Sequence, residues 1–156
     1  MSESVAGEQA DELRVTLELE IPSDVQQIET VVARVTEQCA ALDLGPRQLA
    51  LSVPVALTEA LSNAIIRGNH EDPEKHVRVR TLVDTRRVVL EVRDEGEGFD
   101  FDRCLIDPTT PEQLGREDGR GLFLMRRLVD RVERLDATPH GSIVRLTLIR
   151  GDAGAR

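Results

Sequence analysis

The sequence predicts a two-layer α/β sandwich of the α+β class, in which a mixed, largely antiparallel sheet carries helices on one face. Three observations support this prediction. One segment alternates with period two, and later strand-like segments occur in pairs with short connections, which is typical of hairpins. Other segments repeat apolar residues at helical spacing. The chain has 156 residues, a length that suits one compact domain.

The first half of the chain is predicted to hold one strand and two helices. Residues 14–20 alternate apolar and polar side chains, which indicates a half-buried strand. Pro22-Ser23-Asp24 offers a helix cap, and apolar residues then recur at helical spacing over 25–44. A second helix is expected over 47–67. Pro54 should kink or break it, because proline lacks an amide hydrogen and crowds the preceding turn.

The second half is predicted to hold two strand pairs and a short helix. Residues 76–83 and 87–93 are spaced as a hairpin. Residues 100–118 show no sustained periodicity, and a loop of this length is usually functional or mobile. The closing helix and two strands are expected, in order, at 119–130, 131–136 and 143–150.

These elements place a single domain over residues 13–150. The acidic start, residues 1–12, has the composition of a disordered lead-in, and residues 151–156 form a tail. We therefore expect one folded unit with short extensions.

Composition restricts the function. The formal charge is −9, from 20 Lys and Arg against 29 Asp and Glu, which argues against a phosphate-backbone footprint and direct nucleic-acid binding. With no Trp or Tyr and only three Phe, the core must be aliphatic, and a base-stacking surface is not expected. The start of the chain is unlike a secretory leader, and no apolar run approaches a membrane span. We expect a cytoplasmic protein that does not contact a membrane.

The cysteines and histidines show no metal-ligand pattern. Cys39 and Cys104 stand alone, and we expect two reduced thiols. His70, His76 and His140 also lack metal-ligand spacing, and we expect them at the surface or in loops.

One predicted helix carries a polar pair on the arc opposite its apolar residues. Glu59 and Asn63 lie four residues apart and are therefore neighbours on that arc, with Ile66 between them in projection. An isoleucine there predicts that a ligand, a lid or another chain covers the arc; an ordinary polar face with one apolar residue is the alternative. The apolar arc comprises Leu57, Ala60, Leu61, Ala64 and Ile65.

Two glycine pairs mark further candidate sites. Asp94-Glu95-Gly96-Glu97-Gly98 directly follows a predicted strand, where glycine lets a ligand approach the backbone closely; a plain turn is the alternative. Gly119-Arg120-Gly121-Leu122 lies at a predicted helix start, where free amides and the helix dipole favour an anion; a glycine-assisted junction is the alternative. Neither segment is the phosphate loop GxxxxGK[ST] or the dinucleotide turn GxGxxG.

Taken together and in this order, the three segments resemble the GHKL ATPase superfamily. Within it, the chain resembles the stand-alone anti-sigma-factor serine kinases (RsbW-like) of bacterial partner switching. Residues 56–66 match the family's N box, 94–100 its first glycine box and 119–124 its second. The resemblance covers about residues 15–150 and implies a Bergerat-type ATP-binding fold. Arg67-Gly68-Asn69 departs from the family, which often has histidine after the N box.

The resemblance also implies roles for the matched residues. Asp94 would accept a hydrogen bond from the adenine amino group, with Gly96 and Gly98 packed against base and sugar. Asn63 would ligate Mg²⁺, and Glu59 would be the general base toward a substrate serine. Residues 100–118 would form the ATP lid. The residues implied to bind the nucleotide are Asn63, Asp94, Gly96, Gly98, Gly119, Arg120, Gly121 and Leu122.

The implied function is that of an ATP-dependent serine/threonine protein kinase and anti-sigma factor. Such a protein phosphorylates a STAS-type anti-anti-sigma factor on serine, sequesters a sigma factor in its other state and forms a homodimer. Two alternatives stay open: a non-catalytic ATP- or ADP-binding regulatory module, and a kinase of another signalling branch.

Overall fold

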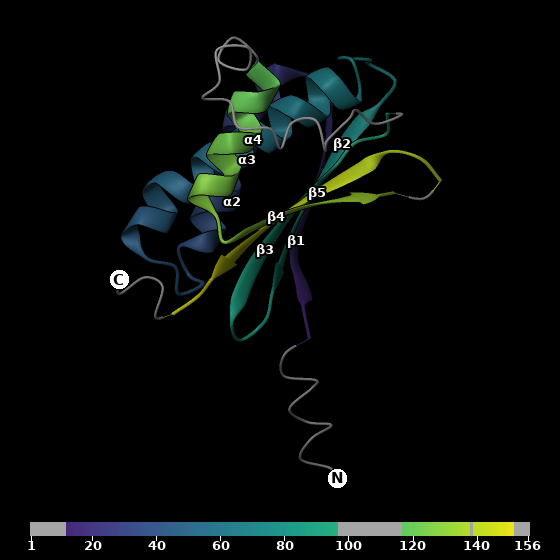
Figure 1. Cartoon of the computed structure of the whole chain (residues 1–156). Helices are drawn as coiled ribbons and strands as arrows, with labels where there is room; N and C mark the ends of the chain where they lie inside the picture. Colours follow the sequence, from purple (N-terminus) through teal and green to yellow (C-terminus); the bar gives the residue numbers. More distant parts are fainter. Residues whose placement is uncertain (1–11, 97–116, 138, 152–156) are drawn as a thin grey trace.

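The computed structural model describes residues 12–96, 117–137 and 139–151, with 117–120 described by their backbone alone. In chain order the elements are β1 (Arg14–Pro22), η1 (Val25–Gln27), α2 (Ile28–Cys39), η2 (Gln48–Ser52), α3 (Val53–Ser62), η3 (Asn63–Gly68), β2 (His76–Val83), β3 (Arg87–Arg93), α4 (Glu117–Leu128), β4 (Arg131–Asp136) and β5 (Ser142–Ile149). Here η1 is a 3-10 helix, and η2 and η3 are π-helical. The order matches the prediction, and sheet and helices form two layers (Figure 1).

The strands form one sheet in the order β1-β2-β3-β5-β4. Every neighbouring pair in this sheet is antiparallel, so the expected mixed component is wrong for the described part of the chain. The β2–β3 hairpin has the predicted bounds, because two mainly apolar segments separated by a short polar turn define both strands. The expected largely antiparallel sheet is confirmed.

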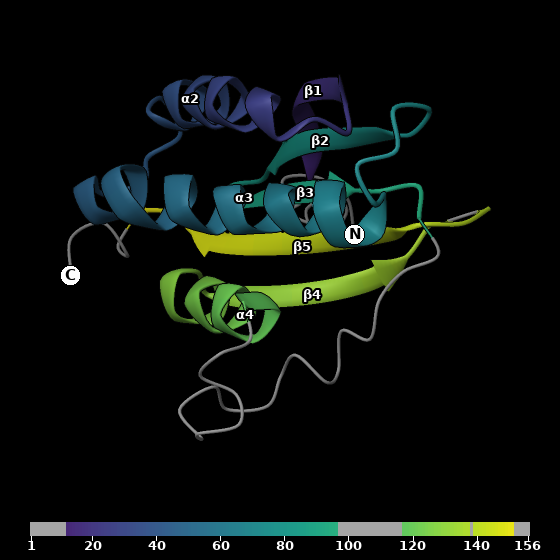
Figure 2. The ribbon, with the colours of Figure 1, turned by 90° about the horizontal axis from the view of Figure 1, so that it is seen from above.

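All three long helices lie on the same face of the sheet. Figure 2 shows α3 along the middle of the sheet, with α2 over the β1–β2 edge and α4 over β4. The helix α3 packs against both of its neighbours. The two-layer sandwich with helices on one face is therefore confirmed.

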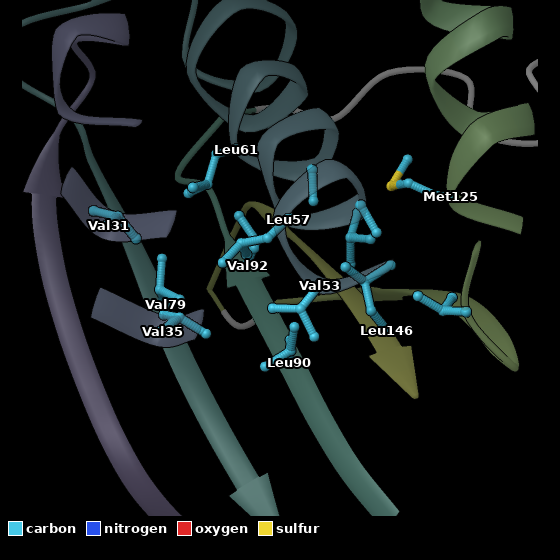
Figure 3. Close-up of a cluster of buried hydrophobic side chains, with 14 of the residues drawn as sticks. Val31, Val35, Val53, Leu57, Leu61, Val79, Leu90, Val92, Met125 and Leu146 are labelled. Atoms are coloured by element: carbon cyan, nitrogen blue, oxygen red, sulfur yellow. The ribbon is translucent and has the colours of Figure 1, made fainter. Parts of the chain in front are cut away.

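An aliphatic core joins these layers, as the composition predicts. Figure 3 shows Leu57 of α3 above Leu90 and Leu146 of the sheet, with Met125 of α4 beside them. All members of the predicted apolar arc are at most 5% exposed: Leu57, Ala60, Leu61, Ala64 and Ile65. Burial raises the pKa of the Cys39 thiol to about 11, which leaves it protonated and unreactive at neutral pH.

The helix that contains Pro54 differs from the prediction. Residues 46–68 are helical without a break, but the turn before Pro54 is π-helical. The Val53 amide donates to the carbonyl of Gln48, five residues earlier. Because a π turn is wider than an α turn, it accommodates a proline that would otherwise crowd the preceding carbonyls. The predicted break is therefore wrong, and the disturbance at Pro54 takes the form of the π turn before it. The regular helix expected after Pro54 instead becomes π-helical again in η3.

The observed helix ends agree with the prediction at Asp24 and differ from it elsewhere. Asp24 caps as predicted, its Oδ1 accepting from the amide of Gln26 at 2.9 Å. The helix predicted over 25–44 ends at Cys39, and the chain turns through Asp43 at a positive φ of 58°. The closing helix is Glu117–Leu128 instead of 119–130. Most of the predicted lead-in, lid and tail lies outside the described residues.

One helix in the described part of the chain, Gln48–Gly68, is long and apolar enough to cross a membrane by length and composition. From the sequence alone, no apolar run was expected to approach the length of a membrane span. The same segment lies between α2 and α4 over the sheet (Figure 2), and its apolar arc forms part of the core. Its packing is that of the central core helix of this sandwich.

Candidate functional site

The predicted N box and first glycine box meet at the carboxyl end of η3. Asp94 follows β3 directly and is only 3% exposed. Its Oδ1 accepts from the amides of Gly96 at 3.0 Å and Ser142 at 3.2 Å. Its Oδ2 accepts from the Ser142 hydroxyl at 3.2 Å. A carboxylate has about four acceptor positions, so one on Oδ2 remains among the described contacts and suits an N–H donor.

The end of η3 and the loop after β3 pack closely together around this carboxylate. The Asp94 side chain lies against Gly68, and Gly96 lies against the carbonyl of Gly68. A β-carbon at either glycine would collide with these neighbours. Glycine is therefore required where the end of η3 meets the loop after β3.

Asn69 extends this contact into a buried polar cluster. Its side chain is fully buried. Its Nδ2 donates to Ser23 Oγ at 2.9 Å and to the His76 carbonyl at 3.0 Å, and its Oδ1 accepts from the Glu95 amide at 2.8 Å. The residue after the helix thus holds the residue after Asp94.

The other end of the site joins the N box to the second glycine box. Glu59 is half-buried on α3, and its Oε2 lies 2.6 Å from the place of a β-carbon at Gly121 of α4. Only a residue without a side chain leaves room for that carboxylate in this position. Part of the arc that contains Glu59 is therefore covered by α4.

Asn63 lies one helical turn beyond Glu59. It begins η3 and is half-buried, and its backbone N–H donates to the Glu59 and Ala60 carbonyls. Ile66, predicted on the same arc, is 42% exposed, and Arg67 is exposed in the last turn. The amide of Asn63 and an exposed apolar side chain thus share the region between the Asp94 and Glu59 ends.

The remaining predicted residues have different positions. Gly119 and Arg120 lie in the first turn of α4, where amides lack intrahelical acceptors. Gly121 is the fifth residue of α4, beyond that set of free amides. The Leu122 side chain is 2% exposed and belongs to the core. Gly98 lies outside the described residues.

The length of the site follows from helix geometry. Gly68, beside Asp94, comes nine residues after Glu59. At about 1.5 Å per residue this is roughly 13 Å, a span comparable with a nucleoside triphosphate. One helix therefore places a buried acceptor and a half-buried carboxylate at the two ends of a strip of that length.

A large apolar groove lies elsewhere. It has a volume of about 810 Å³ and lies between α2 and the start of α3. None of the predicted site residues lines it; its lining includes Ile28, Val32 and Pro54. The polar strip and the groove are separate features.

Sequence reasoning missed Ser142, Asn69 and Gly68 as parts of the site. Gly68-Asn69 directly follows the helix predicted over 47–67 and stood out only as part of a departure from the family pattern, and Ser142 falls at the boundary of a predicted strand. Gly141 next to Ser142 has a positive φ of 103° and lies against the Asp94 carbonyl. That glycine in a strand connection was the one available signal.

A two-layer sandwich whose central helix joins a buried carboxylate to two glycine segments defines a GHKL-type nucleotide-binding domain. The histidine kinase-like ATPase domain family matches residues 21–148. The chain belongs to this family, and its nucleotide is ATP.

Relatives and a solved structure agree with this assignment. The anti-sigma F factor of Bacillus cytotoxicus is 30% identical over 125 residues, which cover 79% of this chain and 86% of that protein. The serine-protein kinase RsbW of Bacillus subtilis is 40% identical over 84 residues, about half of each chain. The mycobacterial sensor histidine kinase MprB is similar in fold, with a TM-score of 0.50 and 18% identity over 85% of this chain and 97% of that one.

Proposed function

We propose that this protein is an ATP-dependent serine-protein kinase and anti-sigma factor of a partner-switching system. It phosphorylates a STAS-type anti-anti-sigma protein on serine and otherwise sequesters a sigma factor. It acts as a cytoplasmic homodimer without direct contact with nucleic acid or a membrane. The observation that carries the proposal is the helix that joins the buried carboxylate of Asp94 to Glu59, in a chain similar to an anti-sigma factor and a serine-protein kinase.

The adenine ring binds at the Asp94 end. The remaining acceptor position on Asp94 Oδ2 receives the adenine amino hydrogen. Guanine would present a carbonyl oxygen to the same carboxylate and leave a buried acceptor pair unsatisfied. Such a loss costs about 1–3 kcal/mol, so ATP is preferred over GTP.

The phosphates extend along the helix toward Asn63 and Glu59. The residues fit Mg²⁺ as a phosphate-bound ion, since this cation takes oxygen ligands and usually keeps waters and substrate phosphates. Among the described residues there is no cluster of three His, Cys, Asp or Glu side chains that would form an all-protein metal cage. Asn63 would hold the ion through its amide oxygen. When bound, Mg²⁺ offsets the phosphate charge in a protein of formal charge −9.

Glu59 is the general base. It accepts the proton of the substrate serine hydroxyl while the serine oxygen bonds to the γ-phosphorus and the bond to the ADP oxygen breaks. Gly121 leaves the room that the Glu59 carboxylate occupies. The phosphates approach the first turn of α4, which contains Gly119 and Arg120, because free amides at a helix start favour an anion.

Phosphorylation then exchanges the partners. A phosphoserine adds about −1.5 to −2 charge at neutral pH, which an acidic kinase disfavours at its surface. The phosphorylated product leaves, and the kinase is free to hold the sigma factor. Because one protein serves two competing partners, their occupancies are linked.

The test uses radiolabelled ATP, the full chain and a STAS-domain protein encoded beside it. Wild-type protein should label the STAS protein on serine, and Glu59→Gln should lose at least about 100-fold of the transfer rate while it still binds ATP. Glu37→Gln, an exposed carboxylate on α2, is the matched control and should label normally. Tight ATP binding without label from the wild type would favour the non-catalytic regulatory module instead.

A further inference from the structure

We propose that Asn69 is a positioning residue that sets the adenine selectivity of Asp94. This inference rests on the proposed placement of adenine at the Asp94 end of the site. Asn69 does not touch the base: it fixes the backbone of the residue that follows Asp94. Its amide contacts and complete burial carry the argument.

The orientation of the Asn69 amide is determined by its surroundings. Ser23 Oγ donates its hydrogen to the Lys75 carbonyl at 2.6 Å, so toward Asn69 it acts as an acceptor. The His76 carbonyl is an acceptor as well. Both face Nδ2, and the third partner, the Glu95 amide, is a donor that faces Oδ1. A flipped amide would oppose acceptor to acceptor and donor to donor.

The Asp94–Gly96 segment is thereby held from two sides. On one side, Ser142 at the start of β5 donates two hydrogen bonds to the Asp94 carboxylate. On the other side, Asn69 accepts from the amide of Glu95. The Glu95 side chain adds a contact to the His76 amide at 2.5 Å. The peptide between Asp94 and Gly96 has little freedom to rotate while both sides are in place.

The π-helical turn η3 brings Asn69 to this position. The Asn69 amide donates to the carbonyl of Ala64, five residues earlier, at 2.8 Å. A π turn holds one more residue than an α turn, so Gly68 passes under the Asp94 carboxylate and Asn69 follows directly at the loop. Asn69, directly after the helix that carries Asn63 and Glu59, thus connects this helix to the segment after Asp94.

Selectivity depends on this tie because Asp94 discriminates only while its open acceptor position points in a fixed direction. An acceptor held in a fixed direction binds the adenine amino group and repels the carbonyl oxygen of guanine. If Oδ1 of Asn69 is removed, the Glu95 amide loses its partner and the segment relaxes. Asp94 can then rotate away from either base, and the preference for ATP falls.

The experiment measures dissociation constants for ATP and GTP, each with magnesium, by calorimetry on the full chain. For Asn69→Ala we expect the ratio of the GTP to the ATP constant to fall at least threefold toward one, mainly through weaker ATP binding. Ser23→Ala is the matched control, because it removes a partner of Nδ2 and leaves the Glu95 contact in place. It should lower the melting temperature and keep the wild-type ratio.

Each outcome bears on a separate claim. A wild-type ratio in folded Asn69→Ala would overturn the role of Asn69, as would an equal fall in Ser23→Ala. Should Asn69→Ala not fold, Asn69→Ser, whose shorter side chain also fails to reach Glu95, is judged by the same ratio. Wild-type protein that shows no preference for ATP would contradict the placement of adenine itself, and so the proposed function.

Discussion

The carboxylate of Glu59 on α3 occupies the space that a side chain at Gly121 on α4 would need. This contact joins the N box to the second glycine box across two packed helices. The absence of a side chain at residue 121 therefore leaves the space that the Glu59 carboxylate occupies. The relationship leads directly to a substitution that separates stability from activity.

Gly121→Ala should displace Glu59 without unfolding the protein. The β-carbon would lie 2.6 Å from Oε2, but the carboxylate is the far end of a flexible side chain and can move. Alanine is favoured over glycine inside a helix by about 1 kcal/mol, so the free energy of unfolding should stay equal or rise. Transfer of label to the STAS protein should fall at least tenfold, because the base is misplaced.

Leu124→Ala is the control, since Leu124 is an exposed residue of the same helix. It should leave the transfer rate unchanged. Normal labelling by Gly121→Ala would show that the position of the Glu59 carboxylate does not matter for transfer.

Asn63→Ala should weaken the magnesium dependence of nucleotide binding. Asn63 lies on the helix between the Asp94 and Glu59 ends of the site, and we propose that its side-chain amide contacts the metal. Calorimetry with ATP at increasing magnesium concentration is the measurement. Removal of one ligand should lower the metal-dependent gain in affinity at least about 10-fold, since even the loss of a partner that only orients a ligand costs about 10–100-fold. Identical magnesium titrations for wild type and variant would remove Asn63 from the metal site.

Asp84 gives a prediction for acid stability that is independent of the nucleotide. Burial raises the pKa of this carboxyl, but the Arg87 side chain and the amides of Arg86 and Arg87 outweigh burial and hold the pKa below its usual value. A carboxyl with a lowered folded-state pKa stabilises the fold above its unfolded pKa of about 3.9, and this contribution is lost as pH falls through the folded value.

Asp84→Asn should therefore unfold about 1–3 kcal/mol more easily than the wild type at pH 7. The difference should shrink as the pH falls below about 4. Denaturant unfolding at a series of pH values measures it. A difference that stays constant down to pH 2 would contradict the proposed linkage.

The sequence predicted the sheet better than the helix ends. The spacing of the segments β2 and β3 and the polar turn between them determined both strands to the residue. The break expected at Pro54 did not occur, because a wider turn absorbs the proline at the cost of one added residue. A prediction based on 3.6 residues per turn cannot anticipate a π-helical turn.

The candidate site was predictable only where its residues are close in the chain. Glu59 and Asn63 follow from helical spacing, and Asp94 from its place after a strand. Ser142 contacts Asp94 across 48 residues, and Asn69 contacts Glu95 across 26. Those contacts depend on strand register and on the π turn that ends the helix, neither of which the residue pattern determines.

The most direct test of the account compares ATP binding by the wild type and by Asp94→Asn in a calorimetric titration with magnesium. In the variant an amide nitrogen would replace an acceptor beside the Ser142 hydroxyl and the adenine amino group. We expect the wild type to bind ATP and the variant to bind it about 5–150-fold more weakly, the equivalent of 1–3 kcal/mol. Equal affinities in the two folded proteins would place the adenine elsewhere and contradict the account.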